Sequence, residues 1–206
     1  MDETLLYYEK NANLLAEKYH SANVDNLHSL LINTFMPNSY LLEIGCGSGR
    51  DTSFMYKNGY DIVAIDGSQK MISVVQKSYP ELLNRLKVVR VPEQMNFSPS
   101  SFDGIYSIAT LMHMDEDSII ETIEKVAKYL KPNSNFLFSV SIERDDIDKK
   151  GKDKQGRYFS IIPKSKWIEY CEKYNLYHQY SEINTDGLNR DKIVWFTCIV
   201  KKGDKY

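Results

Sequence analysis

The chain has 206 residues, 42% of them hydrophobic, which suits one globular domain with a buried core and is too short for two full domains. A formal net charge of −2 gives no basic field to draw the chain to nucleic acid or to an anionic membrane, so neither partner is expected. The acidic start does not resemble a signal peptide, and no apolar run reaches the roughly 18 residues that a membrane span needs. Three scattered cysteines without a C-x-x-C pair favour a reducing, cytoplasmic setting.

Apolar residues at spacings of three and four predict two amphipathic helices within residues 1–36. Short apolar runs then alternate with helical stretches, which indicates a mostly parallel sheet covered on both faces. The expected strands are 40–44, 60–65, 86–91, 102–108, 135–141, 176–182 and 193–200, and the expected later helices are 50–58, 69–78, 116–130 and 167–174.

Residues 183–192 are too few for a parallel crossover, so the last two strands are expected to be antiparallel. The predicted fold is α/β: a three-layer α/β/α sandwich with a mostly parallel seven-stranded sheet, an antiparallel last strand and an N-terminal helical cap. Residues 1–206 are expected to form a single domain, with a cap at 1–36, a core at 40–142, a polar loop at 143–160, and a helix and strand pair at 161–206.

The polar loop, 143–160, begins with a run of basic and acidic residues that contains almost no apolar side chain. This composition predicts a solvated loop or an exposed hairpin. A mobile lid over a ligand is the alternative, because long loops are often functional.

The first predicted strand ends in a glycine-rich run, Gly45-Cys-Gly-Ser-Gly49, that leads into a helix. Ligands bind open parallel sheets at the carboxyl ends of the strands, and glycines let them approach the backbone closely. The N-terminus of the helix favours an anionic group. Asp66 ends the next strand, where a carboxylate can accept hydrogen bonds from two ribose hydroxyls. Together these features predict a nucleoside cofactor.

The glycine spacing is G-x-G-x-G, and Arg50 stands where a dinucleotide-binding loop would place its third glycine. The chain also contains no G-x-x-x-x-G-K-[ST]. Both observations argue against a dinucleotide enzyme and against a nucleoside triphosphatase.

Four segments resemble, in order and spacing, the motifs of class I S-adenosylmethionine-dependent methyltransferases. They are 43–51 (EIGCGSGRD), 63–68 (VAIDGS), 102–113 (FDGIYSIATLMH) and 126–133 (VAKYLKPN). The resemblance implies S-adenosyl-L-methionine as cofactor and S-adenosyl-L-homocysteine as product. It also implies in-line methyl transfer to an oxygen, nitrogen or sulfur of a small-molecule acceptor.

The resemblance implies that the glycine loop holds the methionine part of the cofactor and that Asp66 holds the ribose. Arg50 would reach the cofactor carboxylate or remain a solvated first-turn residue. Val91 stands where the family often has the first acid after the third strand, so the adenine contact passes to Glu93 or to the backbone of Gln94. The implied cofactor-binding residues are Gly45, Cys46, Gly47, Gly49, Arg50, Asp66, Gly67, Ser68, Glu93, Gln94 and Ile108.

His113 comes after the fourth predicted strand and is the candidate general base, because an imidazole titrates near neutral pH. The alternative is a pocket histidine without a proton role. Tyr8 and Tyr19, on the first helix, are either packing residues or weaker substrate candidates. The remaining weak substrate candidates are Arg157, Tyr158, Asn189 and Arg190, and no metal is implied.

Two other functions share this core: a tRNA or protein methyltransferase, and a non-catalytic nucleoside-binding module. The sequence has no basic stripe for RNA. Residues 109–112 (ATLM) replace the [DNS]-P-P-[YFW] motif of enzymes that methylate nucleobase amino groups. The intact glycine loop argues against the binding module. The acceptor and the oligomeric state stay open.

Overall fold

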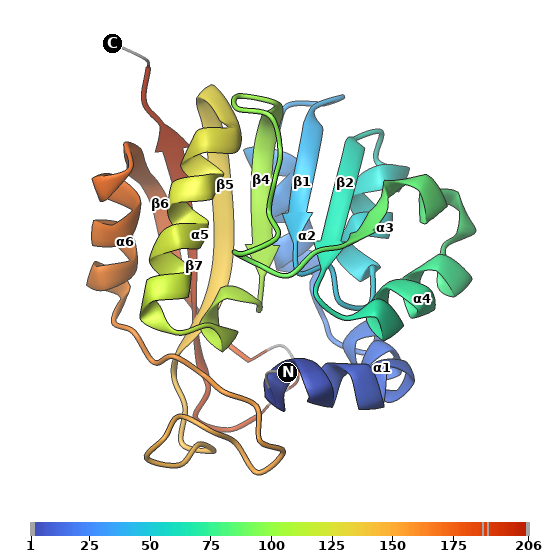
Figure 1. The fold of residues 1–206 in the computed structure, drawn as a ribbon. Helices are drawn as coiled ribbons and strands as arrows, with labels where there is room; N and C mark the ends of the chain where they lie inside the picture. The colour runs from blue at the N-terminus through green and yellow to red at the C-terminus, as the bar shows by residue number, and fades with distance from the viewer. Residues whose placement is uncertain (1–2, 187, 189, 205–206) are drawn as a thin grey trace.

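The computed structural model describes residues 3–186, 188 and 190–204, in which a twisted sheet carries helices on both faces (Figure 1). The strands are β1 (Tyr40–Ile44), β2 (Asp61–Asp66), β3 (Leu86–Val88), β4 (Phe102–Ile108), β5 (Leu130–Glu143), β6 (Leu176–Thr185) and β7 (Val194–Lys202). The α-helices are α1 (Glu3–His20), α2 (Asp25–Thr34), α3 (Arg50–Lys57), α4 (Gln69–Ser78), α5 (Glu116–Tyr129) and α6 (Lys164–Lys173), with short 3₁₀ turns η1 (Pro80–Arg85) and η2 (Leu111–His113).

The seven-stranded sheet has the order β3-β2-β1-β4-β5-β7-β6. Strands β1 to β5 pair in parallel, whereas β7 is antiparallel to both β5 and β6. The predicted mostly parallel sheet with an antiparallel last strand is therefore confirmed. The insertion of β7 between β5 and β6 is a feature that the strand pattern did not predict.

Alternate side chains of the central strands build two apolar layers. Leu42 and Ile105 lie on the face covered by α5 and α6, where Trp167 is fully buried. Leu41 and Tyr106 lie on the opposite face, covered by α2 and α3. Because both faces are covered, the strands read as near-continuous apolar runs, and the polar groups of the site are confined to the strand ends.

The two N-terminal helices occupy different places. Helix α1 lies beyond the carboxyl ends of the strands and packs beside α4 (Figure 1). Helix α2 belongs to the layer on the sheet face, because Leu31 and the nearby Phe35 are buried against β1 and β4. Helix α1 therefore covers the strand ends, while α2 reaches them only with its first turn, at Asn26 and Leu27.

Some element boundaries differ from the prediction. Strand β3 ends at Val88 instead of residue 91, because the chain turns at 90–95 and Pro92 has no N–H to donate to a ladder. Helix α6 begins at Lys164, just after Pro163, whereas the predicted helix begins at residue 167. The prediction missed the first turn of the helix because that turn carries no apolar residue. Among the described residues, no helix has the length and apolar character needed to cross a membrane.

The polar loop, 143–160, is folded back on itself. Isolated bridges join Ile147 to Asp153 and Lys152 to Tyr158. The loop packs on α1, where the Tyr158 N–H donates to Thr4 Oγ1 at 2.9 Å. Helix α1 and this loop, distant in sequence, therefore lie side by side below the strand ends (Figure 1).

Candidate active site

The glycine loop after β1 combines two positions that need glycine for packing with one that is open. Gly45 and Gly49 have φ of 78° and 74°, and added Cβ atoms would lie 2.0 Å from Thr110 Oγ1 and 2.4 Å from Val75 Cγ1. Gly47 has φ of 50°, and an added Cβ would meet nothing nearer than 3.9 Å. Gly47 is thus the point where a ligand can lie against the backbone.

Asp66 ties the glycine loop to the end of β2. Its Oδ2 accepts the Gly47 N–H at 2.9 Å, and its Oδ1 accepts the Ser68 N–H at 2.8 Å. Burial raises the pKa of Asp66, although these two N–H groups oppose the rise. Each carboxylate oxygen keeps a further lone pair, so Asp66 can still accept hydrogen bonds from a ligand.

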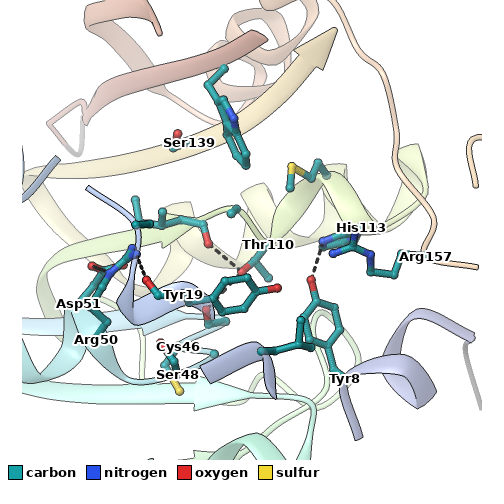
Figure 2. A pocket seen from close by; sticks show the side chains of 18 of the residues that line it. Tyr8, Tyr19, Cys46, Ser48, Arg50, Asp51, Thr110, His113, Ser139 and Arg157 are labelled. Atoms are coloured by element: carbon teal, nitrogen blue, oxygen red, sulfur yellow. Dashed lines mark hydrogen bonds and ion pairs between the residues drawn. The ribbon is translucent and has the colours of Figure 1, made fainter. Parts of the chain in front are cut away.

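A cavity of about 1040 Å³ extends from this loop to the polar loop, which is ample for a cofactor together with a small acceptor (Figure 2). The structure brings most of the predicted site residues to its wall. Those that line it are Tyr8, Tyr19, Gly45, Cys46, Gly47, Arg50, Asp66, Gly67, Glu93, Ile108, His113, Arg157 and Arg190.

Four predicted site residues do not line the cavity. Gly49 begins α3 against Val75, and Ser68 is fully buried, where its hydroxyl caps α4 by accepting the Met71 N–H. Gln94 turns its side chain back to accept the Arg90 N–H. Tyr158 contributes its carbonyl instead of its ring, and Asn189 lies outside the described residues.

Arg50 lines the cavity, and protein groups fix the orientation of its guanidinium. Its Nη1 donates to the Tyr19 carbonyl at 2.9 Å, while Nε and Nη2 donate to Asp51 at 2.8 Å each. His28 Nε2 also contacts Asp51 Oδ1 at 2.8 Å. Burial acts to raise the pKa of Asp51, but the hydrogen bonds from His28 and Arg50 outweigh it and hold that pKa below its usual value. This network joins α1, α2 and α3 under the glycine loop.

Glu43 lines the cavity but was not among the predicted site residues. It is 2% exposed, and burial raises its pKa to about 8. Tyr106 donates its hydroxyl to Glu43 Oε2 at 3.0 Å, and Thr52 donates to the same oxygen. The sequence held one signal for this residue: Glu43 is an acid inside an apolar strand, two residues before the glycine loop.

Hydrogen bonds and burial define the state of the His113 ring. Its Nδ1 lies 2.7 Å from the Tyr158 carbonyl, which can only accept, so Nδ1 carries a proton. Burial lowers the pKa of His113 to about 4, which keeps the ring neutral near pH 7. In the neutral ring Nε2 accepts the Tyr8 hydroxyl at 3.0 Å (Figure 2). A weakly basic imidazole whose Nε2 is already engaged favours a positional role over that of a general base.

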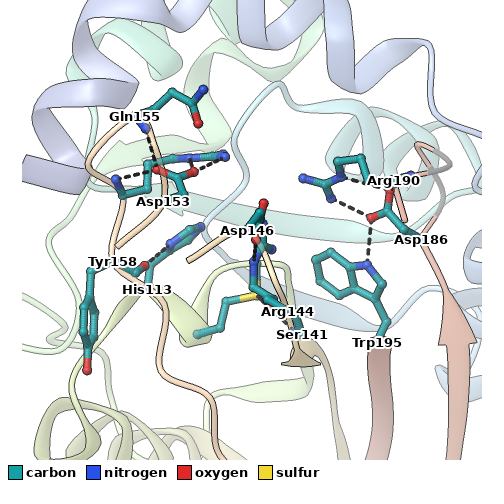
Figure 3. Close-up of polar contacts among 12 residues, drawn as sticks. His113, Ser141, Arg144, Asp146, Asp153, Gln155, Tyr158, Asp186, Arg190 and Trp195 are labelled. Carbon is teal, nitrogen blue, oxygen red and sulfur yellow. Dashed lines mark hydrogen bonds and ion pairs between the residues drawn. The ribbon is translucent and has the colours of Figure 1, made fainter. Parts of the chain in front are cut away.

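The far end of the cavity is formed by β5, β7 and the segment before β7. Asp186 accepts Arg190 Nη2 at 2.6 Å and Trp195 Nε1 at 2.9 Å (Figure 3). Burial acts to raise the pKa of Asp186, but the hydrogen bonds from Arg190 and Trp195 outweigh it and lower that pKa to about 2. Within the described part of the chain, no group of three His, Cys, Asp or Glu side chains could hold a metal ion.

The strand order, the glycine loop after β1 and the carboxylate after β2 define an α/β protein with a nucleoside-type site at the strand ends. The chain belongs to the methyltransferase domain family, whose model matches residues 15–181.

Known relatives agree with this family but differ in substrate. The chain is 28% identical to an O-methyltransferase of Pyrenophora dematioidea over 48% of this chain and 38% of the relative. It is 36% identical to the 18S rRNA (guanine-N(7))-methyltransferase bud23 of Schizosaccharomyces pombe over 35% of this chain and 27% of that protein. The chain thus spans well under two thirds of both relatives.

A solved structure shares nearly the whole fold. It is the 1,6-didemethyltoxoflavin-N1-methyltransferase of Burkholderia thailandensis, which contains bound 1,6-didemethyltoxoflavin and S-adenosylhomocysteine. The TM-score is 0.77 at 16% identity, covering 97% of this chain and 88% of that one.

Proposed function

We propose that this chain transfers the methyl group of S-adenosyl-L-methionine to an oxygen, nitrogen or sulfur nucleophile of a small-molecule acceptor. One observation carries the proposal: the Gly47 N–H donates a hydrogen bond to Asp66 at the wall of the cavity. Tyr8 and His113 line the same cavity. This arrangement supplies a backbone surface and a carboxylate acceptor at one end, and aromatic and cationic side chains at the other.

The residues present fit this cofactor. The open face of Gly47 can lie against the methionine part, Asp66 can accept the ribose hydroxyls, and Gly67 and Glu93, which line the cavity, would lie at the adenine end. Arg50 would support the loop through Asp51 without itself binding the cofactor carboxylate. When bound, the cofactor supplies a methyl group on a sulfonium leaving group, so little acid–base chemistry is asked of the protein.

The remaining work of the protein is positioning and exclusion of water. Helix α1 and the polar loop cover the cavity and would close it over the acceptor. His113 Nε2 accepts the Tyr8 O–H, and the Tyr8 oxygen also contacts Tyr19 and Arg157, so an N–H or O–H of the acceptor would join or replace these contacts. The Tyr8–His113 pair would thereby aim the acceptor atom at the methyl group.

We further infer that residues 1–206 act as one domain. The three cysteines are free and buried, which supports a reducing, cytoplasmic setting. An RNA or protein acceptor is the second candidate, favoured by the similarity to bud23. The net charge of −2 and the covering of the cavity by α1 and the polar loop support a small-molecule acceptor.

Two measurements test the proposal. Calorimetric titration with S-adenosylmethionine and S-adenosylhomocysteine should give binding below the millimolar range, and an absence of binding at millimolar ligand would overturn it. Incubation with radiolabelled S-adenosylmethionine and either a small-molecule library or total RNA and protein should place the label in a small molecule. Label found only in RNA or protein would select the second candidate.

A further inference from the structure

Two buried arginines of the polar loop face the same aromatic ring at the cavity wall. Arg144 Cζ lies 3.8 Å from the centre of the Phe159 ring, and Arg157 Cζ lies 5.3 Å from it. The side chains of Arg144 and Arg157 are only 1% and 13% exposed. All three residues line the cavity, so two cations stand together at a site with little solvent.

Each arginine uses one edge of its guanidinium on a nearby aspartate, as Figure 3 shows for Arg144 and Asp146. Arg144 Nε and Nη2 donate to the two oxygens of Asp146 at 2.8 and 2.7 Å. Arg157 Nε donates to Asp153 Oδ2 at 2.7 Å, and its Nη2 lies 2.6 Å from the same oxygen. A guanidinium has five N–H donors, so each aspartate fixes the orientation and leaves donors on the other edge. That edge of Arg157 faces the Tyr8 hydroxyl in the cavity, whereas the Arg144 side chain is enclosed beside Phe159.

The aspartates do not cancel the positive field in the cavity. Burial is the main cause that lowers the pKa of His113, and the charges of Arg157 and Arg144 lower it further. Asp153 opposes them with a smaller effect. The point where His113 meets Tyr8 is therefore positively biased, and among the described residues no second carboxylate forms an ion pair with either arginine.

We infer that the methyl acceptor carries an oxyanion, a carboxylate or a phosphate group, which binds the outer edge of Arg157 beside Phe159 and Tyr8, while the enclosed Arg144 adds positive charge behind it. The planar guanidinium fork matches such groups, and a preoriented fork in a buried, positively charged site binds more strongly than surface lysines. This inference rests on the proposed function for the identity of its ligand as a methyl acceptor. Anion binding itself can be measured without methyl transfer.

The test uses three probes that share a phenyl ring: benzoate, phenyl phosphate and the neutral benzamide. Each is titrated into the full chain saturated with S-adenosylhomocysteine, by calorimetry or ligand-observed NMR. At least one anion should bind about tenfold or more tightly than benzamide, and the stronger anion tells carboxylate from phosphate. Equal affinities for all three probes, or binding by none, would overturn the inference.

Variants locate the binding. Arg144→Gln and Arg157→Gln should each weaken the preferred anion about tenfold, and Arg157→Lys should recover part of that loss. Arg85→Gln is the matched control, because Arg85 also pairs with an aspartate and lies 4.9 Å from an aromatic ring centre, but outside this cavity. Unchanged anion affinity in both glutamine variants would contradict the assignment.

Two further measurements separate possible failures. Affinity for S-adenosylhomocysteine and the melting temperature, measured for every variant, show whether the loop has kept its fold. If the wild-type chain does not bind S-adenosylhomocysteine, the proposed function fails. The probes are then titrated into the cofactor-free chain, where a preference for anions that is lost in the glutamine variants still supports the arginine site, and no preference refutes it.

Discussion

Replacement of Asp66 by Ala removes the carboxylate that joins the glycine loop to the end of β2. The substitution acts in two ways. The N–H groups of Gly47 and Ser68 lose acceptors at 2.9 and 2.8 Å, and the ligand loses the remaining lone pairs of both oxygens. Hydrogen bonds to a charged group contribute about 1.5–3 kcal/mol each, and they are not additive here. We expect affinity for S-adenosylhomocysteine to fall by about 1–3 kcal/mol, or roughly 5- to 150-fold.

The assay is calorimetric titration of Asp66→Ala beside a control at the opposite end of the same strand. Asp61→Ala also removes an aspartate from β2, but Asp61 is exposed and pairs with Arg85 away from the cavity. The control should bind the cofactor product as the wild-type chain does. A dissociation constant for Asp66→Ala within twofold of wild type, with an unchanged melting temperature, would refute the cofactor role of Asp66.

Three further predictions concern the same site. Gly45→Ala should lower the free energy of unfolding by about 2 kcal/mol or more in thermal melts, because its Cβ would collide with Thr110. Gly47→Ala should lower the free energy of unfolding by only about 1 kcal/mol, and its main effect in titrations should be weaker cofactor binding. The raised pKa of Glu43 makes the wild-type free energy of unfolding fall as pH rises from about 4.5 to about 8, and Glu43→Gln should flatten that fall in pH-dependent denaturant titrations. Nitrogen NMR should find His113 neutral with its proton on Nδ1 from pH 5 to 8, and a midpoint near 6.5 would contradict the lowering of its pKa by burial.

Short stretches of sequence predicted the strands and turns that depend only on neighbouring residues. The apolar run 40–44 and the predicted strand 102–108 match β1 and β4. The glycine loop and Asp66 also came from sequence, because glycines or an acid directly after an apolar run mark the end of a buried parallel strand. Those features place the cofactor end of the cavity.

The acceptor end depends on contacts between distant segments, which no local pattern reveals. Ser139 and Thr197 place their hydroxyls 3.0 Å apart only because β7 pairs with β5. Trp195 reaches Asp186 because β7 also pairs with β6, which ends just before Asp186. The polar loop, 143–160, was predicted to be solvated or to form a lid. The side chain of Arg144 in this loop is nevertheless almost fully buried, because its guanidinium stacks on Phe159 and pairs with a local aspartate.

The position of β7 between β5 and β6 has a consequence for the order in which the chain matures. The residues proposed to bind the cofactor, from Gly45 to Glu93, emerge from the ribosome before β7, which separates β5 from β6. Until β7 is present, β6 has no strand beside it, and β5 exposes unpaired N–H and C=O groups along one edge. The part of the cavity proposed for the methyl donor can thus assemble during synthesis, but the part proposed for the acceptor is completed only when β7 pairs.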